Sequence, residues 1–221
     1  MKEIAQIFLS WRKGQGDRRH LVGVLKKNAT EGVRFSYIPE GVEAAKREGF
    51  TSYAEFSEID KVYKENVIDI FGQRIIKSER SDISDFYQFW EIDPKFKDDR
   101  YYLLAHTQGL IPTDNFEFLA EYNRIKSLCF LTDLAGLSLL QLPAGTISKG
   151  DVLSYQLEKD NPRDPCAVKV FKRDMQVGYI KKVHNRVFHR LGKGKLKLTV
   201  KAIEENGIVK RVFVKVKAVT D

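Results

Sequence analysis

The chain has 221 residues, of which 43% are hydrophobic and 31% are charged, and its formal net charge is +8. This composition is typical of a folded globular protein and excludes an intrinsically disordered chain. No apolar run approaches the roughly 20 residues of a membrane span, and the first residues lack the apolar core of a signal peptide, so we expect a soluble, cytoplasmic protein.

The charge is distributed unevenly along the chain. Residues 136–221 carry 18 Lys and Arg against 8 Asp and Glu, a net charge of +10, which leaves −2 for residues 1–135. This length allows one large or two small domains, and the asymmetry favours two, with the basic one meeting a polyanion. A basic surface that is only solvated would give the same counts, so charge alone leaves both interpretations open.

In the N-terminal part, apolar patterning predicts a mixture of strands and helices. Strands are expected at residues 4–11, 20–25, 33–37, 101–105 and 116–119, and helices at residues 41–49, 59–80 and 84–90. Ser84 is the expected N-cap of the last helix. Its aromatic residues could form a base-stacking platform, but we expect them to lie in the core; they are Phe86, Tyr87, Phe89 and Trp90. Residues 122–135 contain neither Gly nor Pro and predict a packed connection to the next domain rather than a flexible linker.

The C-terminal part reads as a small β-barrel. Strands are expected at residues 137–142, 152–157, 167–171 and 176–180, a helix at 182–191, and a hairpin whose arms are 195–203 and 212–217. Asn206-Gly207 is a hairpin-turn signal. Lysines line one face of this hairpin, where they would be only solvated, protect a sheet edge from pairing, or attract phosphates.

Polar residues gather around the turn that begins at residue 160. Asn-Pro and Asp-Pro steps favour a rigid turn, because proline fixes its own φ and Asx side chains bond the nearby backbone. The next two strands return to the same end of the barrel. We therefore expect one rim that binds DNA, formed by Asn161, Arg163, Asp164, Tyr179, Lys181, Lys182 and Arg186.

These residues carry a family resemblance. The run D-N-P-R-D-P-x-A-V-K-V, followed by V-G-Y-I-K-K, resembles the HIRAN domain over residues 134–218. The resemblance implies an OB-like barrel with small helices that binds single-stranded DNA and grips its 3′ end. It also implies that Asp164 accepts a bond from a terminal hydroxyl and that Lys182 holds a phosphate. Without such a hydroxyl, removing the Asp164 carboxylate should leave affinity nearly unchanged or raise it.

The sequence departs from the family pattern at two places. Members that bind DNA ends carry adjacent stacking aromatics on the first strand, where this chain has Leu139 and Leu140. The loop aromatic between Pro and Asp is replaced by Arg163. Stacking contributes roughly 1 to 3 kcal/mol per base, so we expect phosphate contacts to dominate over end recognition.

A second resemblance covers residues 20–121. The order G-V-L, V-R-F-S-Y, a helix, F-G-Q-R-I-I with Arg80, L-L-A-H-T-Q-G and N-F-E-F-L is similar to the N-terminal subdomain of HipA-type toxin kinases. No catalytic-loop or D-F-G signature follows, so this chain would not itself be the kinase. The resemblance implies a protein partner of that type.

Catalytic and metal-binding patterns are weak. His184 and His189 fall on different faces of the expected helix, the D-x-K spacing of a nuclease site at Asp93 contains a proline, and the two cysteines lack zinc-site spacing. We therefore expect that the protein is not an enzyme and that it binds neither a metal nor a cofactor.

The sequence thus predicts an α+β interaction domain over residues 1–133 and a HIRAN-like β-barrel over residues 134–221. The expected function is that of a non-catalytic DNA-binding regulator, an antitoxin to a HipA-type kinase. The alternatives left open are an accessory factor that binds DNA ends in repair or replication, and an unrecognised nuclease.

Overall fold

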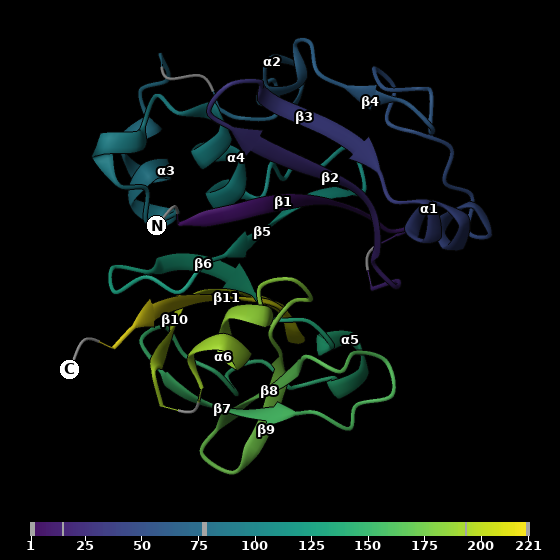
Figure 1. The fold of residues 1–221 in the computed structure, drawn as a ribbon. Helices are drawn as coiled ribbons and strands as arrows, with labels where there is room; N and C mark the ends of the chain where they lie inside the picture. Colours follow the sequence, from purple (N-terminus) through teal and green to yellow (C-terminus); the bar gives the residue numbers. More distant parts are fainter. Residues whose placement is uncertain (1–2, 15, 77–78, 193, 220–221) are drawn as a thin grey trace. The chain divides into compact units, whose positions relative to one another are not determined.

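The computed structural model describes residues 3–14, 16–76, 79–192 and 194–219, and the chain divides into two compact units (Figure 1). The N-terminal unit is Ile4–Glu121, and the C-terminal unit contains the residues from Tyr122 onward together with Glu3. This boundary, between Glu121 and Tyr122, precedes the boundary at residues 133–134 that the sequence predicts.

The N-terminal unit is built on a five-stranded sheet of order β4-β3-β2-β1-β5. Its strands are β1 (Ile4–Trp11), β2 (His20–Asn28), β3 (Gly32–Tyr37), β4 (Val62–Tyr63) and β5 (Phe116–Tyr122). The first three form consecutive antiparallel hairpins, as their apolar alternation predicts. The ring of Phe35 lies 4.9, 5.1 and 5.2 Å from those of Tyr37, Phe56 and Phe71, so an aromatic cluster forms the core against this sheet.

Short helices complete this unit. They are α1 (Pro39–Lys46), α2 (Val67–Gly72), α3 (Ile83–Phe89), the 3-10 helix η1 (Pro94–Phe96) and α4 (Arg100–Thr107). Across both units, no helix within the described residues is long and apolar enough to cross a bilayer.

Three sequence expectations fail in this unit. The strand predicted at residues 101–105 lies inside α4, whose N-cap Asp99 accepts bonds from the amides of Tyr101 and Tyr102. Because nearly every side chain of α4 is buried, its sequence has no polar face to reveal the helical period. The long helix predicted at 59–80 is replaced by β4 and α2, and α3 begins after Asp82, so Ser84 is not its cap.

The aromatic residues of α3 are less buried than expected. No residue of α3 is buried; Phe86, Tyr87 and Phe89 are half-exposed, and only the following Trp90 is buried. The expectation that all four belong to the core is therefore wrong for the first three.

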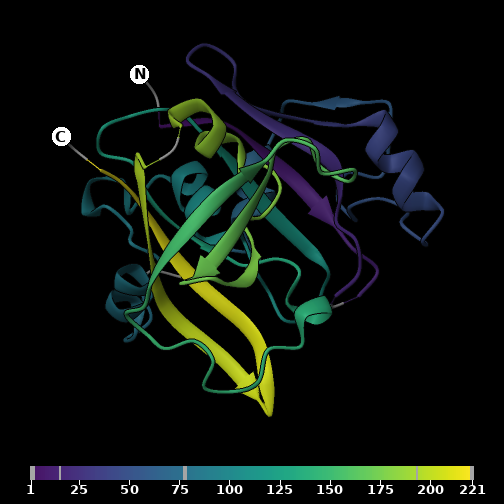
Figure 2. The same cartoon turned by 90° about the horizontal axis from the view of Figure 1, so that it is seen from below.

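The C-terminal unit is a curled, six-stranded antiparallel sheet of order β6-β11-β10-β7-β8-β9 (Figure 2). Its strands are β6 (Cys129–Asp133), β7 (Val152–Glu158), β8 (Ala167–Lys172), β9 (Met175–Tyr179), β10 (Leu196–Asn206) and β11 (Ile208–Ala218). Its helices are α5 (Leu137–Leu140) and α6 (Arg186–Leu191). The mixed α+β architecture and the small barrel expected for this part are both present.

The leucine-rich segment was assigned wrongly from sequence. Residues 137–142 were expected to form the first barrel strand, but they contain α5, and the first strand of this sheet is β6. Gly136 and Gln141 bracket α5 with φ values of 82° and 47°, which turn the chain sharply at both ends. Only Leu137 of this helix is buried, while Leu139 is 79% exposed.

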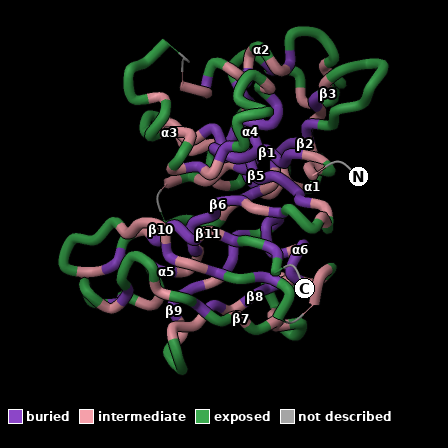
Figure 3. The backbone as a smooth tube through the Cα atoms, turned by 90° about the vertical axis from the view of Figure 1, so that its left-hand side faces the viewer, coloured by how far each residue is buried: buried purple, intermediate pink, exposed green. Residues whose placement is uncertain are grey.

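The core of the C-terminal unit follows the alternation of the β10–β11 hairpin. Leu198 pairs with Val216 and Val200 with Val214, and all four side chains are buried. Figure 3 shows buried segments along these strands and exposed ones in the loops. This frame fixes the loops that carry the polar rim.

Candidate nucleic-acid interface

The loop between β7 and β8 is held in a defined turn by Asn161. The side-chain oxygen of Asn161 accepts bonds from the backbone amides of Arg163 and Asp164 at 2.9 and 3.1 Å. Its side-chain amide donates to Glu158 at 2.8 Å. This Asx turn leaves the side chain of Arg163 exposed to solvent.

Asp164 fixes the loop to the start of α6. One carboxylate oxygen accepts a bond from the Cys166 amide at 3.0 Å, and the other accepts from the side-chain amide of Asn185 at 2.7 Å. Asn185 is 1% exposed and directly precedes Arg186, the first residue of α6. The carboxylate therefore sets the position of the loop relative to the helix, a structural role that its acidic character alone did not reveal.

Glu158 is the centre of a second polar contact beneath this loop. Its carboxylate lies 2.6 Å from the ammonium of Lys169. The Lys169 ammonium and, next, the Asn161 amide hold the pKa of the Glu158 carboxyl below its usual value, and the Tyr179 hydroxyl contributes less. The network links the Asx turn to Tyr179 at the end of β9.

Gly178 allows a second chain segment to approach Tyr179 closely. Tyr179 and Ala135 exchange two backbone bonds, of 2.8 and 2.9 Å. At Gly178 φ is 150°, and a Cβ there would lie 3.0 Å from the Leu134 Cβ and 3.1 Å from the Ala135 oxygen. No side chain fits at Gly178 without displacing that segment, which explains the glycine of the V-G-Y motif.

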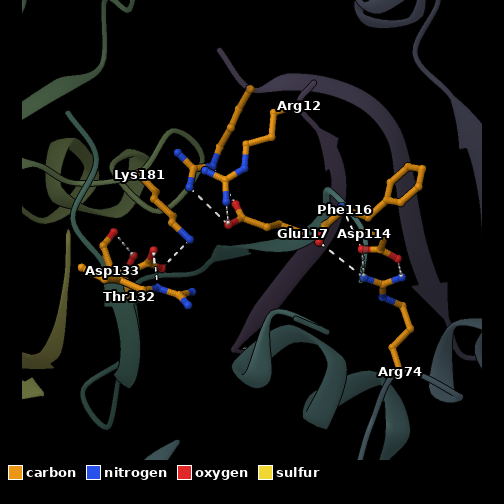
Figure 4. Close-up of polar contacts among 10 residues, drawn as sticks. Arg12, Arg74, Asp114, Phe116, Glu117, Thr132, Asp133 and Lys181 are labelled. Atoms are coloured by element: carbon orange, nitrogen blue, oxygen red, sulfur yellow. Dashed lines mark hydrogen bonds and ion pairs between the residues drawn. The ribbon is translucent and has the colours of Figure 1, made fainter. Parts of the chain in front are cut away.

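The two adjacent lysines after β9 have opposite environments. Lys182 is exposed, whereas Lys181 is 0% exposed and its ammonium pairs with the carboxylate of Asp133 on β6 (Figure 4). The other Asp133 oxygen lies 3.1 Å from the guanidinium of Arg211. Lys181 therefore belongs to the interior of the unit, and its assignment to the DNA-binding set is corrected.

The remaining site residues lie in connected segments. Asn161, Asp164 and Tyr179 are half-buried and shape the rim through the contacts given above. The rim, as we define it from here on, presents Arg163, Tyr179, Lys182 and Arg186. Sequence reasoning missed the residues that connect these groups, Glu158 and Asn185; an Asn just before a basic amphipathic helix was the available signal for the second.

Leu139 lies near the rim on α5, not on a strand. A Cβ at Gly136, the residue before α5, would lie 3.3 Å from the ring of Tyr179, so the helix begins beside that ring. Leu139 offers an exposed apolar surface there, but a leucine has no aromatic face on which a base can stack.

Three comparisons with known proteins bear on this unit. Residues 127–217 match the HIRAN domain family model. The HIRAN-like, OB-like fold expected from the V-G-Y-I-K-K and D-N-P motifs is thereby confirmed, and the match begins before β6 rather than at residue 134. The matched range leaves the whole N-terminal unit, Ile4–Glu121, outside it, and with it the stretch compared above with HipA-type kinases.

Two solved structures are similar at low identity. One is the HIRAN domain of human HLTF, with 19% identity, a TM-score of 0.32, and coverage of 41% of this chain and 75% of that chain. The other is a protein from Lactobacillus plantarum, with 16% identity, a TM-score of 0.32, and coverage of 41% and 94%. The search of curated proteins gave no match.

The residues considered for catalysis have structural contacts. Asp93 caps η1 by accepting a bond from the Lys95 amide at 3.0 Å, which accounts for the D-x-K spacing. His184 is buried, and its Nδ1 lies 2.8 Å from the hydroxyl of Thr132. In the N-terminal unit Arg74 pairs with Asp114 (Figure 4). It also donates to the Gly109 carbonyl, so its role is structural. Within the described ranges no group of His, Cys, Asp and Glu is arranged to hold a metal.

Proposed function

We propose that the C-terminal unit binds DNA through the rim and does not cleave it. The observation that carries the proposal is the pair of exposed cations, Arg163 and Lys182, on two segments that the Asp164–Asn185 bond fixes to each other, within the range that matches the HIRAN model. Cations held on a rigid scaffold bind phosphates at less cost in side-chain entropy than mobile ones. The net charge of +10 over residues 136–221 supports the same partner.

The rim favours contacts to the DNA backbone over recognition of a terminal base. Arg163 stands in place of an aromatic, and Leu139 and Leu140 offer no stacking face. We therefore expect single strands with a 3′ hydroxyl and with a 3′ phosphate to bind about equally, and duplex to bind comparably. A strong preference for the 3′ hydroxyl would instead favour an accessory role at DNA ends in repair or replication.

Titration of the full chain with DNA, followed by amide chemical shifts, tests this proposal. Shifts should concentrate in residues 158–165 and 179–186 and should weaken steeply with added salt, because phosphate contacts release counterions. Shifts confined to the N-terminal unit, or no binding at low salt, would rule the proposal out. Metal-dependent cutting of the DNA would show a nuclease in its place.

We further propose that the N-terminal unit contacts a protein, and that this partner is a HipA-type kinase. The half-exposed aromatic residues of α3 support a protein contact, since such residues are frequent at protein interfaces. The kinase rests on the sequence resemblance of residues 20–121. Co-expression with a HipA-type kinase encoded next to this chain tests it: a complex that relieves the kinase's toxicity is expected, and separate elution without rescue of growth would remove the antitoxin role.

A further inference from the structure

Three chain segments of the C-terminal unit contain basic residues and no carboxylate. These are residues 122–132, 183–203 and 212–219. Their described Lys and Arg residues are Arg124, Lys126, Arg186, Arg190, Lys195, Lys197, Lys201, Lys215 and Lys217. All 30 acidic residues of the protein lie outside these three segments.

The fold brings the three segments together at one end of the sheet. Lys217 on β11 lies opposite Lys197 on β10 and opposite Cys129 on β6 in the strand register. The Ala218 amide donates to the Leu128 carbonyl at 2.9 Å, and the Val219 amide donates to the Lys195 carbonyl at 3.0 Å. We call this surface the basic end; it comprises Arg124, Lys126, Lys195, Lys197 and Lys217, all of them exposed.

The direct pairing of Lys197 with Lys217 costs stability. Like charges opposite each other on an antiparallel pair repel, and both side chains are exposed. On β8 of the same sheet, by contrast, Lys169 lies 2.6 Å from Glu158 and Lys172 lies 2.7 Å from Asp151.

Protection of a sheet edge does not explain the lysines of β11. Lys215 and Lys217 each lie opposite a residue of β10 and a residue of β6, so β11 is interior at both positions. An interior strand has no unpaired backbone row that lysine could shield from another chain. For the lysines of β11, the roles that remain from the sequence are a solvated surface and the attraction of phosphates.

Helix α6 connects the basic end with the rim. Arg186 and Arg190 lie one turn apart on it, and the guanidinium of Arg190 donates to the Tyr122 carbonyl at 3.2 Å, next to the segment that carries Arg124. The helix spans roughly 9 Å, and alternate residues of β10 lie roughly 6.6 Å apart. Basic side chains therefore recur on α6 and on β10 at spacings that the backbone of a single strand can follow.

We propose that the basic end is a second contact for the nucleic-acid backbone, which continues from the rim along α6. This inference rests on DNA binding at the rim and deepens it, because it makes affinity depend on the length of the strand. A strand that fills only the rim gains nothing from Lys197 and Lys217. A longer strand neutralises the repulsion between them.

The test compares fluorescein-labelled single strands of 4 and 12 nucleotides on the full chain. The double variant Lys197→Gln/Lys217→Gln should weaken binding of the long strand on the order of tenfold and lower its salt slope by about 1.4, since each phosphate contact contributes roughly 0.7. Binding of the short strand should stay within twofold. The thermal midpoint of the variant should be unchanged or higher, because a repulsive pair is removed.

The matched control is Lys149→Gln/Lys210→Gln, which removes two exposed lysines outside the basic end and should leave both strands unaffected. Equal affinity of the long strand for the wild type and the Lys197→Gln/Lys217→Gln variant would overturn the inference while leaving the rim intact. Failure of both strands to bind the wild type would instead remove the proposed function. Vesicles with anionic lipids that bind the wild type but not the variant, with DNA binding unchanged, would assign the basic end to a membrane surface.

Discussion

Replacing Asp164 with alanine should both destabilise the C-terminal unit and weaken DNA binding. The substitution removes the acceptor of two bonds, from the Cys166 amide and from the side-chain amide of Asn185. Asn185 is 1% exposed, so its amide would remain buried without that partner. The structure thus changes the expectation, drawn from the sequence, that this carboxylate can be lost without effect.

The magnitude follows from these two bonds. A buried donor that loses its acceptor costs about 1 to 3 kcal/mol, and the turn bond to Cys166 adds about 0.5 to 1.5 kcal/mol. We therefore expect the unfolding free energy of the C-terminal unit to fall by about 2 to 4 kcal/mol. Asp164→Asn retains one carbonyl acceptor and should cost about half as much.

Unfolding must be followed with a probe inside this unit. Trp11 and Trp90 both lie in the N-terminal unit, so tryptophan fluorescence reports on the other half of the chain. Hydrogen exchange of the amides in β8 and β9 gives a local free energy without assuming two-state unfolding of the whole chain.

A double-mutant cycle isolates the contact itself. Asp164→Ala and Asn185→Ala together should cost about 1 to 2 kcal/mol less than the sum of the single variants, because each alone already breaks the bond. Additive losses would refute the claim that this bond joins the loop to α6. Asp164→Ala with unchanged stability but lost DNA affinity would show that the carboxylate contacts the ligand directly.

Three further predictions concern neighbouring residues. Lys181→Ala should lower the stability of the C-terminal unit by about 3 kcal/mol, because it leaves the Asp133 carboxylate buried with one partner fewer. Lys182→Ala should leave stability within about 0.5 kcal/mol and weaken DNA binding. Equal thermal midpoints for the two variants would contradict the buried position of Lys181. Gly178→Ala should cost about 2 kcal/mol or more through the clash with Leu134 and Ala135, measured by the same hydrogen exchange, and a neutral result would show that this segment moves freely. The Asx turn should loosen in acid. Because the pKa of Glu158 is lowered in the folded state, its stabilisation is present above the usual value of 4.5 and is lost as pH falls through the folded pKa. The protection of the Arg163 and Asp164 amides, measured against their intrinsic exchange rates, should therefore fall below pH 4.5 in the wild type and show no such step in Glu158→Gln.

The sequence predicted secondary structure correctly where residues within one segment decide it. The alternation in residues 33–37 and in the β10–β11 hairpin predicted strands correctly, and Pro39 and Gly49 bounded α1 as expected, with Gly49 at a φ of 102°. The D-N-P-R-D-P run also predicted a rigid turn correctly. Its order comes from Asn161 and Asp164, both within the run itself.

The sequence was not informative where a long-range contact decides the outcome. Lys181 and Lys182 are adjacent residues of one type, and only the position of Asp133 on β6 shows that the first is buried. Helix α4 is buried on nearly all sides and α5 has only four residues, so neither displays the helical period. The position of Asn185 before a basic helix suggests a polar contact, but its partner Asp164 lies in another loop and only the structure shows it.

Binding of a single strand of 12 nucleotides to the full chain, measured by fluorescence polarisation across a salt series, tests DNA binding at the rim most directly. Arg163→Ala/Lys182→Ala should reduce affinity on the order of tenfold or more and lower the salt slope by about 1.4, with thermal midpoints unchanged because both side chains are exposed. Lys149→Gln/Lys210→Gln should bind as the wild type does. Equal affinities and slopes for the rim variant and the wild type would contradict the account, because the strand would then bind elsewhere on the chain.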